Sequence, residues 1–151
     1  MRAMVQNRSH LKIDQKRIRR WVGQILRRLG CMNNEISILF VDDNNMLDLN
    51  KRYRGIDRPT DVLSFPQIEG HENFKLRLPD SELILGDVVI SLETAEKQAK
   101  DRGHHLEKEV LILLIHGILH LMRYDHEKSE GMEQEMRQKE EELLSLIKIK
   151  E

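Results

Sequence analysis

Apolar residues recur at helical spacing near the start of the chain. They follow a single helix face at Ile18, Trp21, Val22, Ile25, Leu26 and Leu29. Asp14 can cap the beginning of such a helix, and Gly30 suits the position just past its end. The pattern therefore predicts an amphipathic helix between residues 14 and 30.

Three short apolar runs predict β-strands, at residues 36–41, 61–65 and 83–90. Pro66 stops the second run, because proline cannot donate to a strand ladder. Between the first two runs, Asp42 or Asp43 can cap a helix that reaches Tyr53. Residues 66–81 show weak periodicity and contain proline and acidic residues, so we expect a surface loop there.

The second half of the chain is predicted to be mainly helical. Helices are expected over residues 92–100 and 106–122, and an amphipathic helix follows with Met132, Met136, Leu143 and Ile147 on one flank. From Val110 onward the middle helix is apolar on every side, which is typical of a buried central helix. We predict an α+β fold: one domain over residues 1–151, with a small mixed β-sheet packed against helices around this central helix.

Composition narrows the class of protein. The chain has 151 residues, of which 39% are hydrophobic and 34% charged. Its single cysteine, Cys31, cannot form an internal disulfide and excludes a cysteine-based metal site. The longest apolar run, residues 110–122, is shorter than the about 20 residues that cross a bilayer, and residues 1–11 hold no signal-peptide core. We expect a soluble, cytoplasmic protein.

Charge is distributed unevenly along the chain. Residues 1–60 hold 13 Lys or Arg against 6 Asp or Glu, a net charge of +7, whereas residues 61–151 carry a net charge of −8. The basic residues cluster at 16–28 and again at 51–58. A basic face attracts polyanions, although a solvated helix surface explains the same pattern. The charge pattern permits nucleic-acid binding without establishing it.

Three of the seven histidines form a pattern suited to a metal ion. His116 and His120 are four residues apart, so on a helix their Cβ atoms lie about 5–6 Å apart on one face. Two imidazoles at that separation can bind one Zn²⁺. His126 can join them only if the helix ends between Met122 and Asp125 and the chain folds back.

The alternative for each histidine is a structural role. A histidine on an apolar helix is more often a hydrogen-bonded core residue, and Arg54 is more often paired with a neighbouring acid such as Asp57 or Asp61. His104 and His105 are expected at the surface where a helix begins, and His10 is expected in a loop without a partner. A structural role is less well supported for His116, His120 and His126, because they follow one another at spacings of four and six residues.

Three histidines without a fourth protein ligand leave a coordination position open for water, which is typical of catalytic zinc. Metalloproteases with the same 4-then-6 spacing need a glutamate directly after the first histidine as general base. Position 117 is glycine, and this argues against peptide hydrolysis. Gly117 can instead allow the close approach of another backbone or of a substrate.

The segment from His116 to His126 resembles the His-Gly-x-Leu-His-Leu-x-Gly-Tyr-Asp-His signature of the YbeY family of bacterial endoribonucleases. Further matches are Leu-Asn at 49–50, Tyr-Arg-Gly at 53–55, Pro-Thr-Asp-Val-Leu-Ser-Phe-Pro at 59–66 and Leu-Gly-Asp-Val-Val-Ile at 85–90. The resemblance runs from about residue 36 to 126. Arg123 replaces the family's usual glycine, so the sequence differs from the family pattern at the turn after the helix.

The resemblance implies a zinc-dependent endoribonuclease that prefers single strands and acts in 3′-end maturation of small-subunit (16S) ribosomal RNA and in ribosome quality control. It implies one Zn²⁺ per chain, held by His116, His120 and His126, with water bound to the metal attacking the phosphodiester. It also implies a catalytic role for Arg54. The expected partners are single-stranded or ribosomal RNA and the small ribosomal subunit, with no membrane and no DNA.

Two other functions remain open at this point. One is a protease-like metal hydrolase that uses the same histidines, which Gly117 disfavours. The other is a ribosome assembly factor whose zinc is mainly structural.

Overall fold

The computed structural model of the protein describes residues 2–67, 84–122 and 130–147. In chain order the elements are β1 (Arg2–Asn7), α1 (Gln15–Arg28), β2 (Glu35–Val41), α2 (Asp43–Arg54), β3 (Val62–Pro66), β4 (Ile84–Ser91), α4 (Leu92–Arg102), α5 (Leu106–Leu121) and α6 (Glu130–Leu146).

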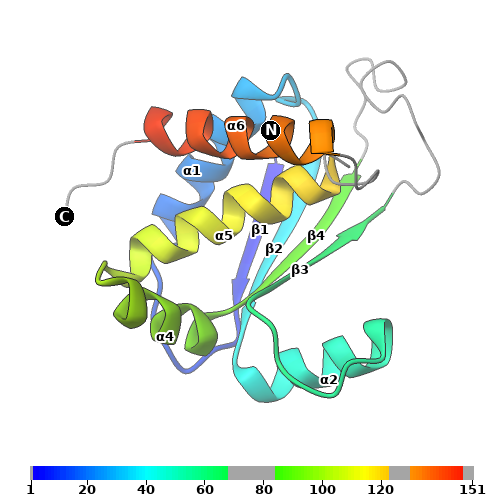
Figure 1. The fold of residues 1–151 in the computed structure, drawn as a ribbon, viewed down its shortest axis with the longest axis vertical. Coiled ribbons are helices and arrows are strands. Elements are labelled where there is room, and N and C mark those ends of the chain that lie inside the picture. The colour runs from blue at the N-terminus through cyan, green and yellow to red at the C-terminus, as the bar shows by residue number, and fades with distance from the viewer. Residues whose placement is uncertain (1, 68–83, 123–129, 148–151) are drawn as a thin grey trace.

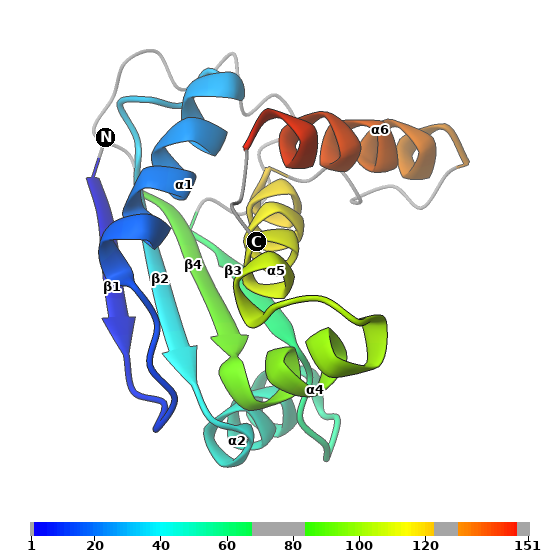
Figure 2. The same cartoon turned by 90° about the vertical axis from the view of Figure 1, so that its left-hand side faces the viewer.

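The strands form one mixed sheet in the order β1-β2-β4-β3 (Figures 1 and 2). Strands β1, β2 and β4 are parallel, and the edge strand β3 runs antiparallel to β4. The predicted α+β class with a small mixed sheet is therefore confirmed. Strand β1 was not predicted from the sequence, because its short run contains only one buried hydrophobic residue, Val5, while Met4 is exposed.

Helices α1 and α5 cover one face of the sheet (Figure 2). Their apolar residues form one continuous core with the inward side chains of β2 and β4, such as Ile38, Phe40 and Val88. A smaller cluster lies on the other face, where Met46 of α2 packs with Val89 and Leu63. Helix α5 is buried along most of its length, as its all-round apolar sequence predicts.

The predicted helix ends are largely reproduced. Oδ1 of Asp14 accepts hydrogen bonds from the backbone N–H groups of Lys16 and Arg17, at 3.1 and 3.2 Å, and Gly30 adopts a positive φ of 75° past the end of α1. Asp42 occupies the cap position of α2, but its side chain makes no capping hydrogen bond.

Helix α5 ends where the metal-site hypothesis requires an end. Its last residue is Leu121, and the N–H of the cap residue Met122 donates to the carbonyl of Ile118 at 3.1 Å. Residues 123–129, which include Arg123, Asp125 and His126, lie outside the described residues. So does nearly all of the loop predicted over residues 66–81.

Among the helices of the described residues, none combines the length and the apolar character needed to cross a membrane.

Candidate active site

Two of the three predicted ligands, His116 and His120, meet on the surface of α5. Their Nε2 atoms lie 2.8 Å apart and their ring centroids 4.3 Å apart. Both rings lie on the helix face turned away from the core, and the His116 side chain is 43% exposed. The i, i+4 spacing thus produces the convergence that the sequence predicts, while His126 lies outside the described residues.

The two nitrogens suit a zinc ion. Two ligands of a tetrahedral zinc with Zn–N distances of about 2.0–2.1 Å lie about 3.3 Å apart. The observed 2.8 Å therefore needs a movement of only about half an ångström between two side chains. Imidazole nitrogens are also ligands that zinc prefers. The donor atoms present fit the ion.

A glutamate from another helix fixes the orientation of the first imidazole. Nδ1 of His116 lies 2.8 Å from Oε1 of Glu140 on α6. A carboxylate can only accept, so Nδ1 carries the proton and, in the neutral ring, Nε2 is the nitrogen with the lone pair. This is the arrangement by which carboxylates orient metal-binding histidines.

Helix α6 is held in place by its apolar residues. Met136, Leu143 and Ile147 are all buried against the main core. Glu140 shares their helix face at spacings of three, four and seven residues, so it points toward α5 rather than toward solvent. Sequence reasoning missed Glu140, although an acid that interrupts an apolar stripe was a usable signal.

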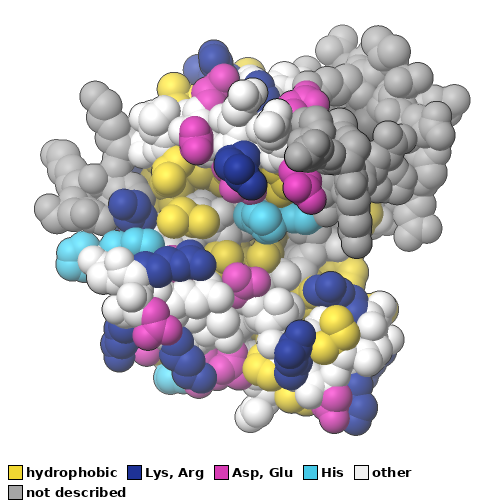
Figure 3. Space-filling model, in the orientation of Figure 1, with side chains coloured by type: hydrophobic (Ala, Val, Ile, Leu, Met, Phe, Trp, Pro, Cys, Tyr) yellow, Lys and Arg dark blue, Asp and Glu magenta, His cyan; other side chains and the backbone are white. Residues whose placement is uncertain are grey.

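The histidines and Arg54 line one cavity of about 420 Å³. Its walls are made by the end of α2, the start of β3 and the exposed side of α5, with Arg54, Thr60, Asp61, Val62, Leu63, Ser64, His116 and His120 as lining residues. Figure 3 shows histidine side chains at the centre of this face and Lys and Arg side chains over the α2 region below them. The fold thus brings together residues separated by 66 positions, from 54 to 120.

Gly117 explains how α5 can lie so close to the sheet. A Cβ at this position would lie 2.7 Å from Cγ1 of Val88 and 3.1 Å from Cγ2 of Val62. The hydroxyl of Ser64 donates to the Gly117 carbonyl at 2.8 Å. The expected close approach of another element at Gly117 is therefore present, and Ser64 joins the edge strand to the helix.

Asp61 is engaged by its own loop and by α4. Its Oδ1 accepts from the N–H of Val62 at 2.8 Å, and its Oδ2 accepts from the amide of Gln98 at 3.2 Å. Within the described part of the chain, Arg54 forms no ion pair with either Asp57 or Asp61. Its guanidinium is exposed at the wall of the cavity.

A second group with the spacing of a metal site lies where the C-terminal ends of β1, β2 and β4 meet. Ligand atoms of His10, Asp42 and Glu93 all lie within 4.8 Å of one another. Asp42 accepts hydrogen bonds from the Ser9 hydroxyl and from Nδ1 of His10, the latter at 2.9 Å, and Glu93 accepts from the Asp43 N–H at 2.7 Å. The expectation that His10 has no partner is wrong.

The pKa values in this group follow from those contacts. The hydrogen bond that Nδ1 of His10 donates to Asp42 raises the pKa of His10. Burial alone would raise the pKa of Asp42, but the hydrogen bonds from Ser9 and His10 outweigh it, so the pKa of Asp42 is lowered. These hydrogen bonds satisfy the polar side chains of the group without a bound ion. They also link the ends of β1, β2 and β4.

His104 is also less exposed than the sequence suggests. Its Nε2 lies 2.7 Å from Oε1 of the fully buried Glu109, whose Oε2 accepts from Arg102 at 2.8 Å. The ring is 14% exposed and helps satisfy a buried carboxylate at the start of α5. Its role is structural.

Comparisons with known proteins show which family the chain belongs to. The family model described as Endoribonuclease YbeY matches residues 4–148. A protein named Endoribonuclease YbeY from Aquifex aeolicus is 46% identical over 136 residues, covering 90% of this chain and 85% of its own. One of the same name from Pelotomaculum thermopropionicum is 50% identical over 115 residues, covering 76% and 73%.

A solved structure shares the fold. The solution structure of TM1509 from Thermotoga maritima matches with a TM-score of 0.65 and 27% identity, covering 94% of this chain and 87% of that one. Together with the family match, this shows that the chain belongs to the YbeY family of endoribonucleases.

Proposed function

We propose that the protein is a zinc-dependent endoribonuclease specific for single strands, which matures the 3′ end of small-subunit ribosomal RNA and serves ribosome quality control in the cytoplasm. The observation that carries the proposal is the shared cavity, in which two convergent imidazoles face an arginine without an acidic partner among the described residues. Family membership supports RNA as the substrate.

In this proposal His116, His120 and His126 hold one Zn²⁺, and the small ribosomal subunit is the partner. When bound, zinc supplies Lewis-acid polarisation of a phosphoryl oxygen and acidifies water toward neutral pH. Glu140 keeps the His116 ring oriented with Nε2 toward the cavity. The backbone of α5 is joined to β3 through Ser64, and this link holds the two rings in fixed positions relative to the sheet.

Arg54 acts on the phosphate. Negative charge develops on the nonbridging phosphate oxygens during hydrolysis, and a planar guanidinium can donate two parallel hydrogen bonds to them. Arg54 is the last residue of α2, and Gly55 follows in a left-handed conformation that ends the helix beside the cavity. The side chain therefore starts from a fixed backbone position at the cavity wall.

Replacing Arg54 with alanine is expected to lower kcat on single-stranded RNA by about 10²–10³-fold while leaving metal content unchanged. Arg54→Lys should recover only part of the loss, because lysine lacks the bidentate fork. Steady-state kinetics together with elemental analysis measures both quantities. Lys51→Ala, on the same helix and exposed, is the charge control and should change kcat little. Loss of metal or of folding in Arg54→Ala would show that the arginine is structural.

Replacing Glu140 with alanine is expected to weaken zinc binding by about 10–100-fold, because the His116 ring loses the group that orients it. Glu140→Gln should lie between alanine and the wild type, since its carbonyl oxygen can still accept from Nδ1. Competition with a chromophoric chelator measures the affinity directly, without an activity assay. Glu141→Gln is the matched control, because this neighbouring side chain is exposed. Unchanged zinc affinity in Glu140→Ala contradicts the assigned role.

Position 117 also separates RNA hydrolysis from the protease alternative. Its Cα faces Val88 and Val62 of the sheet, so even a methyl group there is crowded and a glutamate would have to displace these side chains. This packing disfavours a general base directly after the first histidine and so supports RNA hydrolysis over the protease alternative.

A substrate panel tests the proposed function. Purified protein loaded with zinc is incubated with single-stranded RNA, duplex RNA, single-stranded DNA and denatured casein. The proposal predicts cleavage of the single-stranded RNA alone. Cleavage of casein with intact RNA would establish the protease alternative, and a zinc-bound protein that cleaves none of the four would favour the assembly factor.

A further inference from the structure

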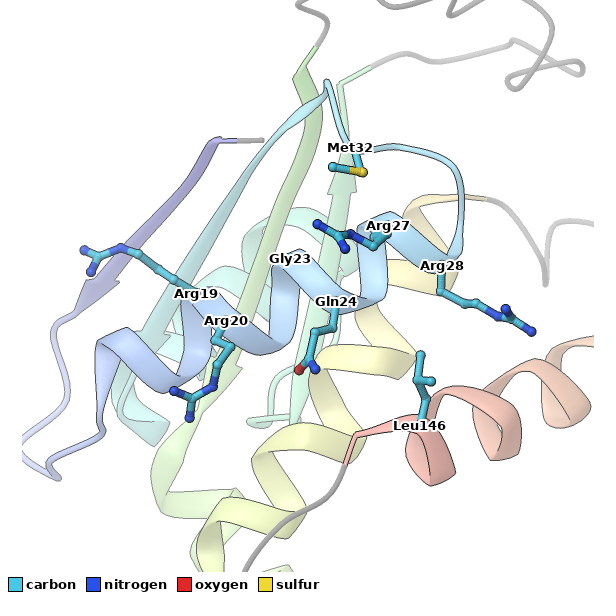
Figure 4. Close-up of a pocket in the computed structure, with 8 residues that line it drawn as sticks. All are labelled: Arg19, Arg20, Gly23, Gln24, Arg27, Arg28, Met32 and Leu146. Atoms are coloured by element: carbon cyan, nitrogen blue, oxygen red, sulfur yellow. The ribbon is translucent and has the colours of Figure 1, made fainter.

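A second hollow, separate from the cavity, runs along α1. It measures about 660 Å³ and is lined by Arg19, Arg20, Gly23, Gln24, Arg27, Arg28, Met32 and Leu146. None of these residues lines the cavity that holds the histidines. Figure 4 shows Arg19, Arg20 and Arg27 extending from α1 to one side, while Arg28 points the other way, toward α6.

Helix α1 concentrates positive charge at the expense of its own stability. Its 14 residues include six Lys or Arg and no acid, in a chain that has 26 Asp and Glu. Lys16 and Arg20 form a like-charge pair at i, i+4, and Lys16 and Arg17 lie in the first turn, near the positive end of the helix dipole. Each such contact is unfavourable for the helix. An ordinary solvated helix would mix the two signs.

Three of the arginines have no acidic partner in the part of the chain that the structure describes. Nε of Arg28 donates to Oε2 of Glu142 at 2.9 Å and so joins α1 to α6, and Arg17 lies over the ring of Trp21. Within the described ranges, no hydrogen bond or ion pair occupies the side chains of Arg19, Arg20 or Arg27. Their guanidinium groups are exposed and open to an anion.

The shape of the hollow suits an extended strand that carries regularly spaced phosphates. Arg20 and Arg27 are separated by about 10 Å along the helix axis, and Gly23, which has no side chain, lies between them. Met32 and Leu146 add apolar surface at the rim, with 43% and 48% of their areas exposed. Arginine rather than lysine predominates, and its planar fork matches phosphate oxygens in a bidentate fashion.

We infer that this hollow binds the phosphate backbone of single-stranded RNA outside the cleavage cavity, as an auxiliary binding site for the substrate. The inference rests on the proposed function for the identity of the ligand. Arg19, Arg20 and Arg27 contact phosphates, and the apolar rim faces the bases. Longer RNA therefore gains affinity from contacts that the cavity does not supply.

The test measures binding of a fluorescent 30-nucleotide single-stranded RNA by anisotropy, with a chelator present so that no cleavage occurs. Arg20→Gln/Arg27→Gln removes two phosphate contacts. Because the slope of log K against log salt changes by about 0.7 per contact, we expect a slope lower by about 1.4 and about tenfold weaker binding at 0.15 M salt. Lys100→Gln/Lys108→Gln removes the same charge away from both hollows and should bind nearly as the wild type does. Circular dichroism verifies that each variant is folded.

Equal binding by the two double variants would overturn the inference, since net charge alone would then explain the affinity. Displacement of the RNA by a polyglutamate peptide of equal charge, as effectively as by unlabelled RNA, would also overturn it and point to an acidic protein as the occupant. Weaker RNA binding in the arginine variant alone supports the proposal that RNA binds in the hollow. This holds even if the wild type fails to cleave RNA, and in that case the proposed function fails separately.

Discussion

Replacing His120 with alanine is expected to abolish RNA cleavage, with a loss of about 10³-fold or more, while the protein stays folded. The ring is partly exposed at the cavity wall, so its removal opens no void in the core. Alanine is also the best helix former, and position 120 lies inside α5. What the variant loses is one of the two described nitrogens that converge on the proposed ion.

The result is read from three measurements on one preparation: cleavage of single-stranded RNA, zinc content and thermal unfolding. His105→Ala serves as a control, because His105 is an exposed histidine at the cap of the same helix. Unfolding of His120→Ala would indicate a structural metal, as the assembly-factor alternative requires. Wild-type cleavage by this variant would place the active site elsewhere.

Replacing Gly86 with alanine is expected to cause the largest loss of stability, about 3 kcal/mol or more. A Cβ at this position would lie 2.3 Å from the backbone oxygen of Phe65 and 3.0 Å from both Leu121 and Pro66. The backbone φ of 144° is itself unfavourable for any residue with a side chain. Because the close contact is with backbone, no rotamer change relieves it.

The position of Gly86 connects this loss of stability to the site. β3 pairs with β4 at Gly86, and the end of α5 packs over it one residue after His120. Denaturant unfolding of Gly86→Ala should therefore be compared with Gly103→Ala, which also has a positive φ but nothing within 4 Å of its Cβ. The control should lose only about 1–2 kcal/mol, the cost of a left-handed residue. Equal losses in the two variants would show that β3 moves aside freely.

Much of the fold was predictable because its elements have strong local periodicity. Helices α1 and α5 and strands β2 and β4 agree with the sequence patterns to within a few residues. Strand β1 was missed, since Arg2–Asn7 has weak alternation and is stabilised mainly by pairing with β2. Each residue of β1 pairs with a residue 33 positions later in the chain. A contact of that kind leaves no local signal.

The candidate site could likewise be predicted only in part from the sequence. The meeting of His116 and His120 follows from helix geometry alone, whereas Arg54 was identified only through the resemblance to a family. Glu140 and the group of His10, Asp42 and Glu93 were not found, because each arises from segments brought together by tertiary packing. His104 was misplaced at the surface because its buried partner, Glu109, looks like an ordinary solvated acid in the sequence.

The most direct test of the metal site is elemental analysis of the native protein combined with anomalous scattering from its crystals. We predict one zinc ion per chain, with an anomalous peak about 2.0–2.1 Å from Nε2 of His116 and of His120 and with His126 as the third ligand. A peak between His10, Asp42 and Glu93, or an ion bound to His116 and His120 with His126 pointing away, would contradict the account.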